Sequence, residues 1–566
     1  MNHPWRSAYD DGIPETIGIP EKPLAAYLDE TAAKFANRPA LIFGARVGSR
    51  LMDAAMSYSE LNRQVNRLAA ALQKMGVQKG ERVAVMLPNC PQYVITAYAV
   101  WRLGAALVCC NPLYTPREVE YLLNDSGAQT MVVMSGVYDN VRKIRGKTGL
   151  KRVIVTNIKE YFPGLLKFLF TLTKEKKEGH RINFAADAET FAFQKVLAAA
   201  AAKPQPVDVQ PEDVATLIYT SGTTGRPKGA CHIHRSQTVN AEILNMWAGS
   251  RPGKDVMLAA MPFFHIYGLM VILNTVIAGA MTAVLIPNPR DMEQVLMAIE
   301  KHRVTFYLGV PAMFVGFNNH PKTPRYDMSS LRFATSAAAP LAPEVQTRFE
   351  EIAGVPLIEA YGLTETIVAS MNPVAGARAG TIGVPMPNND MRVVDEQNGT
   401  QVQPPGERGE IIVKGPQVMQ GYWNNPDASA EAVRTGPDGT DGWFFTGDIG
   451  VMDEDGYFRI VDRKNDMIIA SGYNVYPAEV EAVLYDHPMV LEAAVYGVAD
   501  EKRGETVKAA IVLKPDETAT EQEFIDFCKQ QLAAYKVPKI IRFQDELPKS
   551  LIGKVLRRVL REEEQS

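Results

Sequence analysis

The feature that most constrains the fold is the alternation of helical and extended segments between residues 57 and 133. From a predicted N-cap at Ser59, apolar residues recur at helical spacing as far as Met75, and Gly76 ends the helix. Shorter apolar segments follow, predicted as strand, helix and strand at 82–87, 91–103 and 105–109. Strands that alternate with helices in this way predict a parallel sheet covered on both faces.

Length and composition are those of a large globular chain. It has 566 residues, enough for about three or four domains, and 46% of them are hydrophobic, enough to bury a large core. These values exclude a disordered, a collagen-like or a small disulfide-stapled protein. The net charge of −4 offers no broad positive field for nucleic acid, so we expect no nucleic-acid partner.

The cysteines and the first residues predict a cytoplasmic protein. The five cysteines form neither a CxxC pair nor a metal-ligand spacing, and such a sparse, odd set fits a reducing compartment. The N-terminal residues lead into acidic positions without an apolar run, so we expect no signal peptide. The apolar segment 268–286 contains Asn274 and Thr275 and lacks flanking basic clusters. It is therefore predicted as a buried helix running into a buried strand, not as a membrane span.

Residues 159–203 form an insert with two interpretations. An apolar run at 161–170 is followed by three lysines and two glutamates between 174 and 178. Such a pattern suits a peripheral contact with the inner face of a membrane, and it also suits a helix packed on the domain with solvated lysines. The glutamates dilute the positive charge, which favours the packed helix. The alanine- and proline-rich stretch at 198–211 is predicted as a linker.

The last hundred residues have the pattern of a separate small module. The composition becomes polar and charged around 462–466. Beyond it we predict two helices near 477–485 and 521–534, and two strands near 491–498 and 507–513. This is a small α+β domain of ordinary size.

The segment 217–229 carries the most specific chemical signal. An apolar strand leads into the sequence TSGTTGRPKG, whose glycines let the backbone approach a polyanion closely. Its hydroxyls and N–H groups can donate to phosphate oxygens, and Lys228 adds positive charge. The segment therefore predicts a triphosphate-binding loop. Because the Walker spacing is absent, a generic P-loop ATPase is excluded.

Three further segments carry weaker signals. Residues 361–366 offer an aromatic face for a base and, in Glu365, an oxygen ligand for Mg²⁺. Asp448, with Arg463 downstream, can accept from ribose hydroxyls. Lys554 follows a glycine turn that can present it to a site. Taken singly, each has an ordinary explanation as a helix cap, a turn or a solvated lysine.

Together and in this order, the four segments resemble the adenylate-forming superfamily of acyl-CoA synthetases, luciferases and peptide-synthetase adenylation domains. The N-terminal segment with Pro4 and Trp5 and the apolar insert at 161–170 are most similar to the corresponding segments of bacterial long-chain fatty acid–CoA ligases. The resemblance implies an α/β fold with a large N-terminal domain of layered β-sheets with helices at 1–462. It also implies a hinge at 463–466 and a small mobile α+β C-terminal domain at 467–566. Both a monomer and a homodimer stay open.

The resemblance also implies a reaction in two halves. The carboxylate of a medium- or long-chain fatty acid attacks the α-phosphorus of ATP, giving acyl-adenylate and pyrophosphate. The thiolate of coenzyme A then attacks the acyl group, giving acyl-CoA and AMP. Because several anionic oxygens meet in the first step, catalysis is expected to rest on positioning and on charge neutralisation, with Mg²⁺ as cofactor.

Individual residues receive roles from the same resemblance. The residues implied to hold the β- and γ-phosphates are Thr220, Ser221, Thr223, Thr224 and Lys228, and the implied Mg²⁺ ligands are Thr220 and Glu365. The residues implied around the α-phosphate and adenine are Thr364, Tyr361, Ala360, Glu359 and Ala338, and those at the ribose are Asp448 and Arg463. The remaining roles are Lys554 between carboxylate and α-phosphate, His265 at the mouth of the acyl pocket, and Gly472 beside the pantetheine arm. A buried structural histidine is the alternative for His265.

The chain departs from the family pattern at three places. Relatives often have lysine at Asn465, two glycines at Ala337 and Ala338, and glycine at Ala360. Each added methyl narrows a close-packed site, so we expect a shifted acyl preference.

Several alternatives stay open. An aryl-CoA or other carboxylic acid–CoA ligase and a luciferase-like oxidase are compatible with the same motifs. A fatty acyl–AMP ligase is disfavoured, because no extra insertion follows the hinge. A non-catalytic lipid-binding membrane scaffold belongs to a different class. Its expected mark is loss of the charged site residues, yet Glu365, Asp448, Arg463 and Lys554 are all present.

Overall fold

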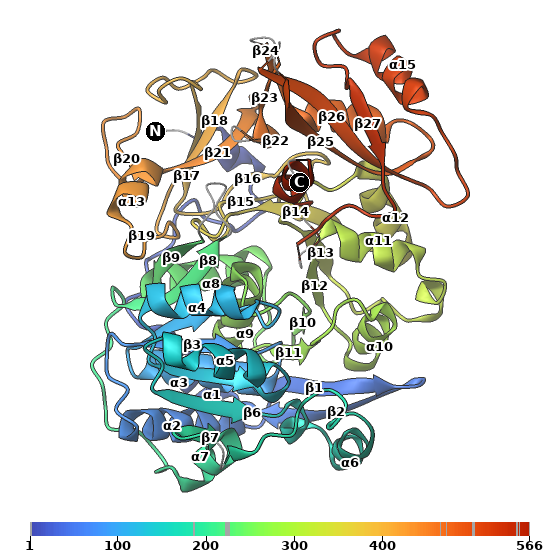
Figure 1. The fold of residues 1–566 in the computed structure, drawn as a ribbon. Coiled ribbons are helices and arrows are strands. Elements are labelled where there is room, and N and C mark those ends of the chain that lie inside the picture. Colours follow the sequence, from blue (N-terminus) through green and yellow to red (C-terminus); the bar gives the residue numbers. More distant parts are fainter. Residues whose placement is uncertain are drawn as a thin grey trace.

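The structure is a computed structural model that describes residues 3–184, 187–220, 227–463, 466–470, 473–500, 504–550, 553 and 555–564. In this part of the chain two large sheets form the body, a third sheet borders them, and a fourth belongs to the C-terminal region (Figure 1). The predicted α/β fold, with a large N-terminal domain of layered sheets and a small C-terminal α+β domain, is confirmed.

The first large sheet has the strand order β19-β9-β8-β4-β3-β5-β6-β7. In that order its strands are Gly421–Tyr422, Lys228–Ile233, Val214–Thr220, Ala106–Cys109, Arg82–Met86, Thr130–Met134, Arg152–Thr156 and Thr190–Ala192. From β8 to β7 every pair is parallel, as the alternation of helices and strands predicts. Strand β9 follows β8 in the chain and pairs with it antiparallel, so the two strands form a β-hairpin.

The second large sheet has the order β16-β15-β14-β13-β12-β10-β11-β1-β2. In that order its strands are Val384–Pro385, Ser370–Met371, Leu357–Tyr361, Phe333–Ser336, Phe306–Gly309, Val256–Ala259, Thr282–Leu285, Pro39–Val47 and Arg50–Ser57. The run from β14 to β1 is parallel throughout. The carboxyl ends of these strands therefore lie along one edge, where the chain leaves each strand in a loop.

The main core lies between the two large sheets. The side chains of Val83 and Val85 on β3 belong to this core. Those of Ala84 and Met86 point to the other face of the sheet, where they pack in a second cluster with residues of α4 and α5. Helix α3 (Pro91–Arg102) has eleven consecutive buried residues. A helix that is apolar all round in this way belongs inside the molecule, covered on several sides.

The remaining helices cover the sheets or the sheet edges. Those of the first half are α1 Leu24–Lys34, α2 Tyr58–Lys74, α4 Pro116–Ser126, α5 Tyr138–Ile144, α6 Gly164–Thr173, α7 Phe193–Ala199 and α8 His234–Trp247. Those that follow are α9 Asn274–Ala278, α10 Met292–His302, α11 Pro311–Asn319, α12 Pro343–Ala353 and α13 Pro426–Ala432. Short 3₁₀ turns are η1 Pro4–Ala8, η2 Ser135–Val137, η3 Arg145–Lys147, η4 Ile158–Tyr161 and η7 Thr323–Arg325.

The third and fourth sheets follow one another in the chain. The third is formed by β17 Asp390–Val394, β18 Arg408–Lys414, β20 Val433–Arg434, β21 Trp443–Met452 and β22 Phe458–Arg463. The fourth is formed by β23 Ile468–Ala470, β24 Tyr473–Val475, β25 Val490–Asp500, β26 Gly504–Leu513 and β27 Ile540–Phe543. Its helices are α14 Pro477–Tyr485, α15 Glu521–Gln531 and α16 Arg557–Glu563. The predicted C-terminal module is thus present, with additional strands that periodicity did not predict.

The predicted start of α2 is wrong by two residues. Ser57 is the N-cap, and its hydroxyl accepts a hydrogen bond from the Glu60 backbone N–H at 3.2 Å. Ser59, the predicted cap, lies inside the first turn and is exposed. Both serines stand before an apolar periodic run, so the sequence pattern alone did not decide between them.

The apolar segment 268–286 is folded into the core as predicted. It forms most of the π-helix η6 (Tyr267–Leu273), then α9, and then β11. Among the residues that the structure describes, no helix has the length and apolarity needed to cross a membrane.

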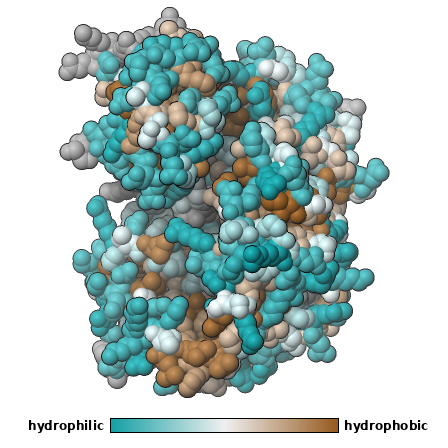
Figure 2. All heavy atoms as spheres, turned by 90° about the vertical axis from the view of Figure 1, so that its right-hand side faces the viewer, coloured by the Kyte–Doolittle hydropathy of each residue, from teal (hydrophilic) through white to brown (hydrophobic). Residues whose placement is uncertain are grey.

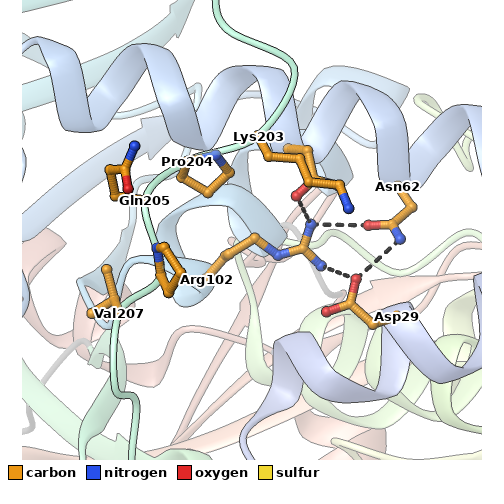
Figure 3. A pocket seen from close by; sticks show the side chains of 9 residues that line it. Asp29, Asn62, Arg102, Lys203, Pro204, Gln205 and Val207 are labelled. Atoms are coloured by element: carbon orange, nitrogen blue, oxygen red, sulfur yellow. Dashed lines mark hydrogen bonds and ion pairs between the residues drawn. The ribbon is translucent and has the colours of Figure 1, made fainter.

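The stretch at 198–211 does not link two domains, because β7 before it and β8 after it belong to the same sheet. It is also held to the body. The Gln205 backbone N–H donates to the Gln73 side chain at 2.8 Å. Residues 203–207 line a polar recess over α1, α2 and α3 (Figure 3). In that recess Arg102 donates to Asp29, Asn62 and Asn66.

The capping geometry gives a direct test with a matched control. We expect Ser57→Ala to lower the free energy of unfolding by about 1 kcal/mol, because it removes the acceptor of the Glu60 N–H. Ser59→Ala should change it by less than about 0.5 kcal/mol. Urea unfolding of both variants measures the difference, and the opposite order of effects would contradict the assignment.

Candidate active site

The ends of the predicted phosphate loop lie opposite one another in a hairpin. Thr220 ends β8, Lys228 begins β9, and the two are register partners. The Thr220 hydroxyl donates to the Lys228 carbonyl at 3.4 Å. Ser221, Thr223 and Thr224 lie outside the described residues. The hairpin begins at the carboxyl end of a parallel strand, which is where open α/β sheets place their ligands.

A tight turn follows β14 and presents Thr364 and Glu365. Gly362 begins it, and a Cβ added there would collide with the carbonyl oxygen of Ile367. Ile367 itself has φ +57°, in the left-handed region that a branched side chain rarely adopts. The turn therefore requires the glycine of the predicted motif, and it holds both polar residues half-buried at the sheet edge.

Hydrogen bonds at this turn join the two large sheets. His232 of β9 donates from Nε2 to the Thr364 carbonyl at 2.7 Å, because a carbonyl oxygen can only accept. Burial lowers the pKa of His232 to about 4, so the ring is neutral and keeps one N–H for this bond. The Met419 backbone N–H donates to the Glu365 carbonyl at 2.7 Å. The hairpin and the turn are thereby fixed relative to each other.

Tyr422 connects Glu365 with Lys228. Its hydroxyl donates to Glu365 Oε1 at 2.8 Å, and the Lys228 ammonium lies 5.2 Å from the centre of its ring. Burial raises the pKa of Tyr422 above its ordinary value, and the Glu365 carboxylate adds to the rise, so the hydroxyl stays protonated. Tyr422 thus contacts a carboxylate through its hydroxyl and an ammonium over its ring.

The third sheet contributes Asp448 to the same edge. The Tyr361 hydroxyl donates to Asp448 Oδ2 at 2.6 Å, and Asp448 is buried. Arg463 is the register partner of Asp448 on β22, and nothing is described of its side chain. A carboxylate has several lone pairs, so one that accepts from a tyrosine hydroxyl is also a suitable type of acceptor for ligand hydroxyls.

Glu359 lies in the middle of β14, and Ala338 follows the end of the neighbouring strand β13 by two residues. Glu359 is paired in register with Ser336 and accepts from the Leu341 backbone N–H at 3.3 Å. Burial raises the pKa of Glu359 to about 7, against the lowering effect of backbone hydrogen bonds from Leu341 and Gly380. Ala338 has φ +71°, a conformation that favours glycine. The alanine therefore occupies a backbone conformation that glycine adopts more readily.

His265 follows β10 on the same edge of the second sheet. Its Nδ1 accepts from the Tyr267 backbone N–H at 3.3 Å. The Tyr267 hydroxyl donates to the Gly309 carbonyl at 3.2 Å, at the end of β12. Strands β10, β12, β13 and β14 are consecutive in this parallel sheet, so the loops carrying His265, Ala337, Ala338 and Tyr361 share one edge.

The C-terminal region is docked beside this edge. A Cβ added at Gly553 would lie 3.1 Å from Ala312 Cβ, at the start of α11. Lys554, Asn465 and Gly472 lie outside the described residues. The Asp462 carboxylate accepts from the Ala478 N–H at 3.0 Å, at the N-terminus of α14. The Tyr476 hydroxyl donates to Glu396 at 3.1 Å, which ties the fourth sheet to the third.

Two sequence matches cover most of the chain. Residues 28–423 match the family described as AMP-binding enzyme, and residues 479–554 match the AMP-binding enzyme C-terminal domain. The chain belongs to the AMP-binding enzyme family. The predicted resemblance to adenylate-forming enzymes is thereby confirmed.

Named relatives of this AMP-binding enzyme align along nearly its whole length. A long-chain-fatty-acid–CoA ligase of Bacillus subtilis (strain 168) is 40% identical, covering 99% of this chain and 98% of its own. A long-chain-fatty-acid–CoA ligase of Escherichia coli O6:H1 is 38% identical, and the alignment covers 100% of this chain and 98% of that ligase. The 4-coumarate–CoA ligase 1 of Solanum tuberosum is 33% identical, covering 96% and 94%.

A solved relative is available in two states. MatB from Rhodopseudomonas palustris with bound ATP has a TM-score of 0.81 to this chain, and apo MatB has 0.71. Both are 29% identical to it and cover 96% of this chain and 99% of MatB. Since sequence and coverage are the same, the difference is one of conformation. The AMP-binding enzyme described here is closer to the ATP-bound form.

The structure adds two residues that sequence analysis missed, His232 and Tyr422. His232 lies on the same face of β9 as Lys228, because side chains four residues apart on a strand point to the same side. This spacing can be read from the sequence, and it would have indicated that His232 lies near the site. Tyr422 lies in a two-residue strand far along the chain, and nothing local marks its contact with Glu365.

The raised pKa of Glu359 predicts a pH-dependent stability. The folded protein keeps the proton up to about pH 7, whereas the unfolded chain releases it at lower pH. The contribution of this group to the free energy of unfolding therefore falls as pH rises from about 5 to 7, by about 3 kcal/mol at most.

We expect Glu359→Gln to remove this decline, because the amide does not titrate. Urea unfolding between pH 5 and 8 measures it, with the exposed Glu344→Gln as the matched control. Parallel pH curves for Glu359→Gln and the unmodified protein would contradict the assignment.

Proposed function

We propose that the protein is an AMP-forming acid–thiol ligase that activates a fatty acid with ATP and transfers the acyl group to coenzyme A. The observation that carries the proposal is the meeting of the hairpin, the 361–367 turn and Asp448 at one sheet edge. Support for the substrates comes from relatives named long-chain-fatty-acid–CoA ligase, which align over the whole chain.

The first half-reaction needs the negative charge of ATP to be held and screened. Lys228 supplies an ammonium, and Thr220 supplies a hydroxyl at the start of the hairpin. Ser221, Thr223 and Thr224 complete the phosphate loop, and Thr364 contacts the α-phosphate. Neutralising these oxygens lets the carboxylate of the acid approach the α-phosphorus.

Thr220 and Glu365 are the proposed ligands of Mg²⁺. One carboxylate and one hydroxyl suit an ion that takes most of its other ligands from water and phosphate. Among the described residues no cluster of three acidic, histidine or cysteine side chains could hold a metal alone, which fits an ion that arrives with the nucleotide. When bound, Mg²⁺ would screen the pyrophosphate oxygens.

The nucleoside and the acyl chain occupy neighbouring parts of the sheet edge. Tyr361 lies against adenine, with Ala338, Glu359 and Ala360 around it, while Asp448 and Arg463 bind the ribose. His265 stands at the mouth of the acyl pocket. Support for this arrangement comes from the order of the parallel strands, which places the His265 loop two strands from the Ala338 loop.

The small C-terminal domain serves each half-reaction with a different residue. We propose a domain 1–462, a hinge at 463–466 and a mobile domain 467–566. Lys554 bridges the carboxylate and the α-phosphate in the first step, and Gly472 admits the pantetheine arm in the second. The approach of Gly553 to Ala312 and the likeness to ATP-bound MatB support an arrangement suited to the first step.

A second candidate within the same chemistry is an aryl-CoA ligase. The 33% identity to a 4-coumarate–CoA ligase supports it. The two candidates differ in the acid that they accept and not in the nucleotide site.

The proposal is tested by pyrophosphate release with ATP, Mg²⁺ and coenzyme A across saturated acids of increasing length, with benzoate and coumarate as controls. We expect release that depends on the acid and is fastest with medium- or long-chain fatty acids. Faster release with the aromatic acids would favour the second candidate, and release without any acid would contradict both.

The division of labour in the C-terminal domain is tested with Lys554→Ala. We expect this variant to lose adenylation by about a hundredfold or more while it converts supplied acyl-adenylate to thioester at nearly the normal rate. Lys549→Ala is the matched control, because Lys549 lies five residues earlier in the chain and pairs with Glu492 on the surface of the same domain. Equal loss of both half-reactions in Lys554→Ala would refute the division.

A further inference from the structure

Arg557 is a largely buried cation at the first position of α16, three residues after Lys554. Its side chain is 19% exposed. The N-terminal end of a helix carries partial positive charge, which disfavours a cation there. The first turn of α16, which the structure describes in full, contains no acidic residue to offset this effect. The position of Arg557 is therefore determined by contacts outside its own helix.

Two carboxylates from other elements hold the Arg557 guanidinium. It donates to Glu481 of α14 through Nη2 at 2.7 and 2.8 Å and through Nε at 3.2 Å, and to Asp466 through Nη1 at 2.9 Å. Glu481 is fixed in turn, because it also accepts from the Val495 backbone N–H of β25 at 2.7 Å. Burial lowers the pKa of Arg557, but the two carboxylates outweigh this effect and keep the pKa above its ordinary value. The guanidinium is therefore charged and bound on two sides.

Asp466 connects this ion-pair cluster to the proposed hinge, of which it is the last residue. Its bond to Arg557 joins the hinge to α16 across 91 residues of sequence. Arg561, one turn further along α16, lies 3.8 Å from the same carboxylate. On the other side of the hinge, Asp462 accepts from the Ala478 N–H of α14 at 3.0 Å. Both ends of the hinge are thus held against helices of the C-terminal region.

The loop that precedes α16 is closed by its own backbone contacts. The Leu556 N–H donates to the Pro548 carbonyl at 2.8 Å, and Lys549 and Val555 form an antiparallel bridge. Only Leu556 separates the bridge from Arg557. A guanidinium that is fixed at the hinge therefore also fixes the base of the loop whose sequence contains Lys554.

We propose that Arg557 is a positioning residue for Lys554, which ties the Lys554 loop to Asp466 so that the loop and the hinge move as one unit. The inference rests on the proposed function, in which Lys554 acts in adenylation. The C-terminal region forms an upper lobe, and the surface is hollowed between it and the body (Figure 2). A side chain that this lobe adds to the site is placed accurately only if the lobe is rigid between hinge and loop. Arginine suits the task, because its planar fork binds two carboxylates at once.

The test measures the two half-reactions separately in Arg557→Lys and Asp466→Asn. The first variant keeps the positive charge and loses the fork, and the second breaks the link to the hinge while the pair with Glu481 stays. With ATP, Mg²⁺ and dodecanoate, and without coenzyme A, each should release pyrophosphate about tenfold more slowly or worse. Thioester formation from supplied dodecanoyl-adenylate and coenzyme A should change by less than about twofold. The matched control is Arg558→Lys, which should behave normally, because Arg558 is exposed and pairs with Glu562 within α16.

A double-mutant cycle separates positioning from stability. In the Lys554→Ala background, Asp466→Asn should lower adenylation by less than about twofold, because the side chain that it helps to place is already absent. A substitution that only loosens the domain would lower the rate by the same factor in both backgrounds. Urea unfolding of every variant gives the folded fraction, so that rates are compared per folded molecule.

Three results would each overturn the proposal. Arg557→Lys and Asp466→Asn could adenylate at the normal rate, they could lose both half-reactions equally, or their loss could persist undiminished in the Lys554→Ala background. Each of these results leaves the proposed function intact, because the unmodified protein still releases pyrophosphate in response to the acid. Absence of that release in the unmodified protein would instead contradict the proposed function, and this inference with it.

Discussion

The site depends on the hydrogen bond between His232 and the carbonyl of Thr364. It joins a strand of one large sheet to the turn that ends a strand of the other, across 132 residues of sequence. Because burial keeps the imidazole neutral, the bond is a single fixed donor and acceptor pair and does not change with ordinary changes of pH. The hairpin ending at Lys228 and the turn carrying Glu365 therefore face each other in the folded chain.

The hydrogen bond between His232 and Thr364 also brings the charged groups of the site together. Lys228 lies over the Tyr422 ring, Glu365 accepts from the Tyr422 hydroxyl, and Asp448 accepts from the Tyr361 hydroxyl. Fixed charges and dipoles of this kind stabilise a reacting polyanion without reorganising during the reaction. These charged groups come from the two large sheets and the third sheet. The C-terminal region contacts the third sheet region through the hydrogen bond of Tyr476 to Glu396, so it lies where it can add further side chains to the site.

Much of the fold followed from periodicity, since helix and strand patterns are local properties. The bounds of α3, β3, β4 and α14 were predicted to within about one residue. The hairpin and the 361–366 turn, both singled out from the sequence, contact each other in the structure through His232 and Thr364. What the sequence could not supply were contacts between distant segments. The bond of Tyr422 to Glu365 and the left-handed backbone of Ala338 depend on tertiary packing, as do the ion pairs of Arg557.

The central claim is that one nucleotide site is built jointly by the two large sheets and the third sheet. The most direct measurement is calorimetric titration with a non-hydrolysable ATP analogue in the presence of Mg²⁺, using the unmodified protein, Lys228→Ala and Asp448→Asn. We expect a single site, with affinity weakened about tenfold or more by each substitution. Unchanged affinity in either variant would contradict a shared site.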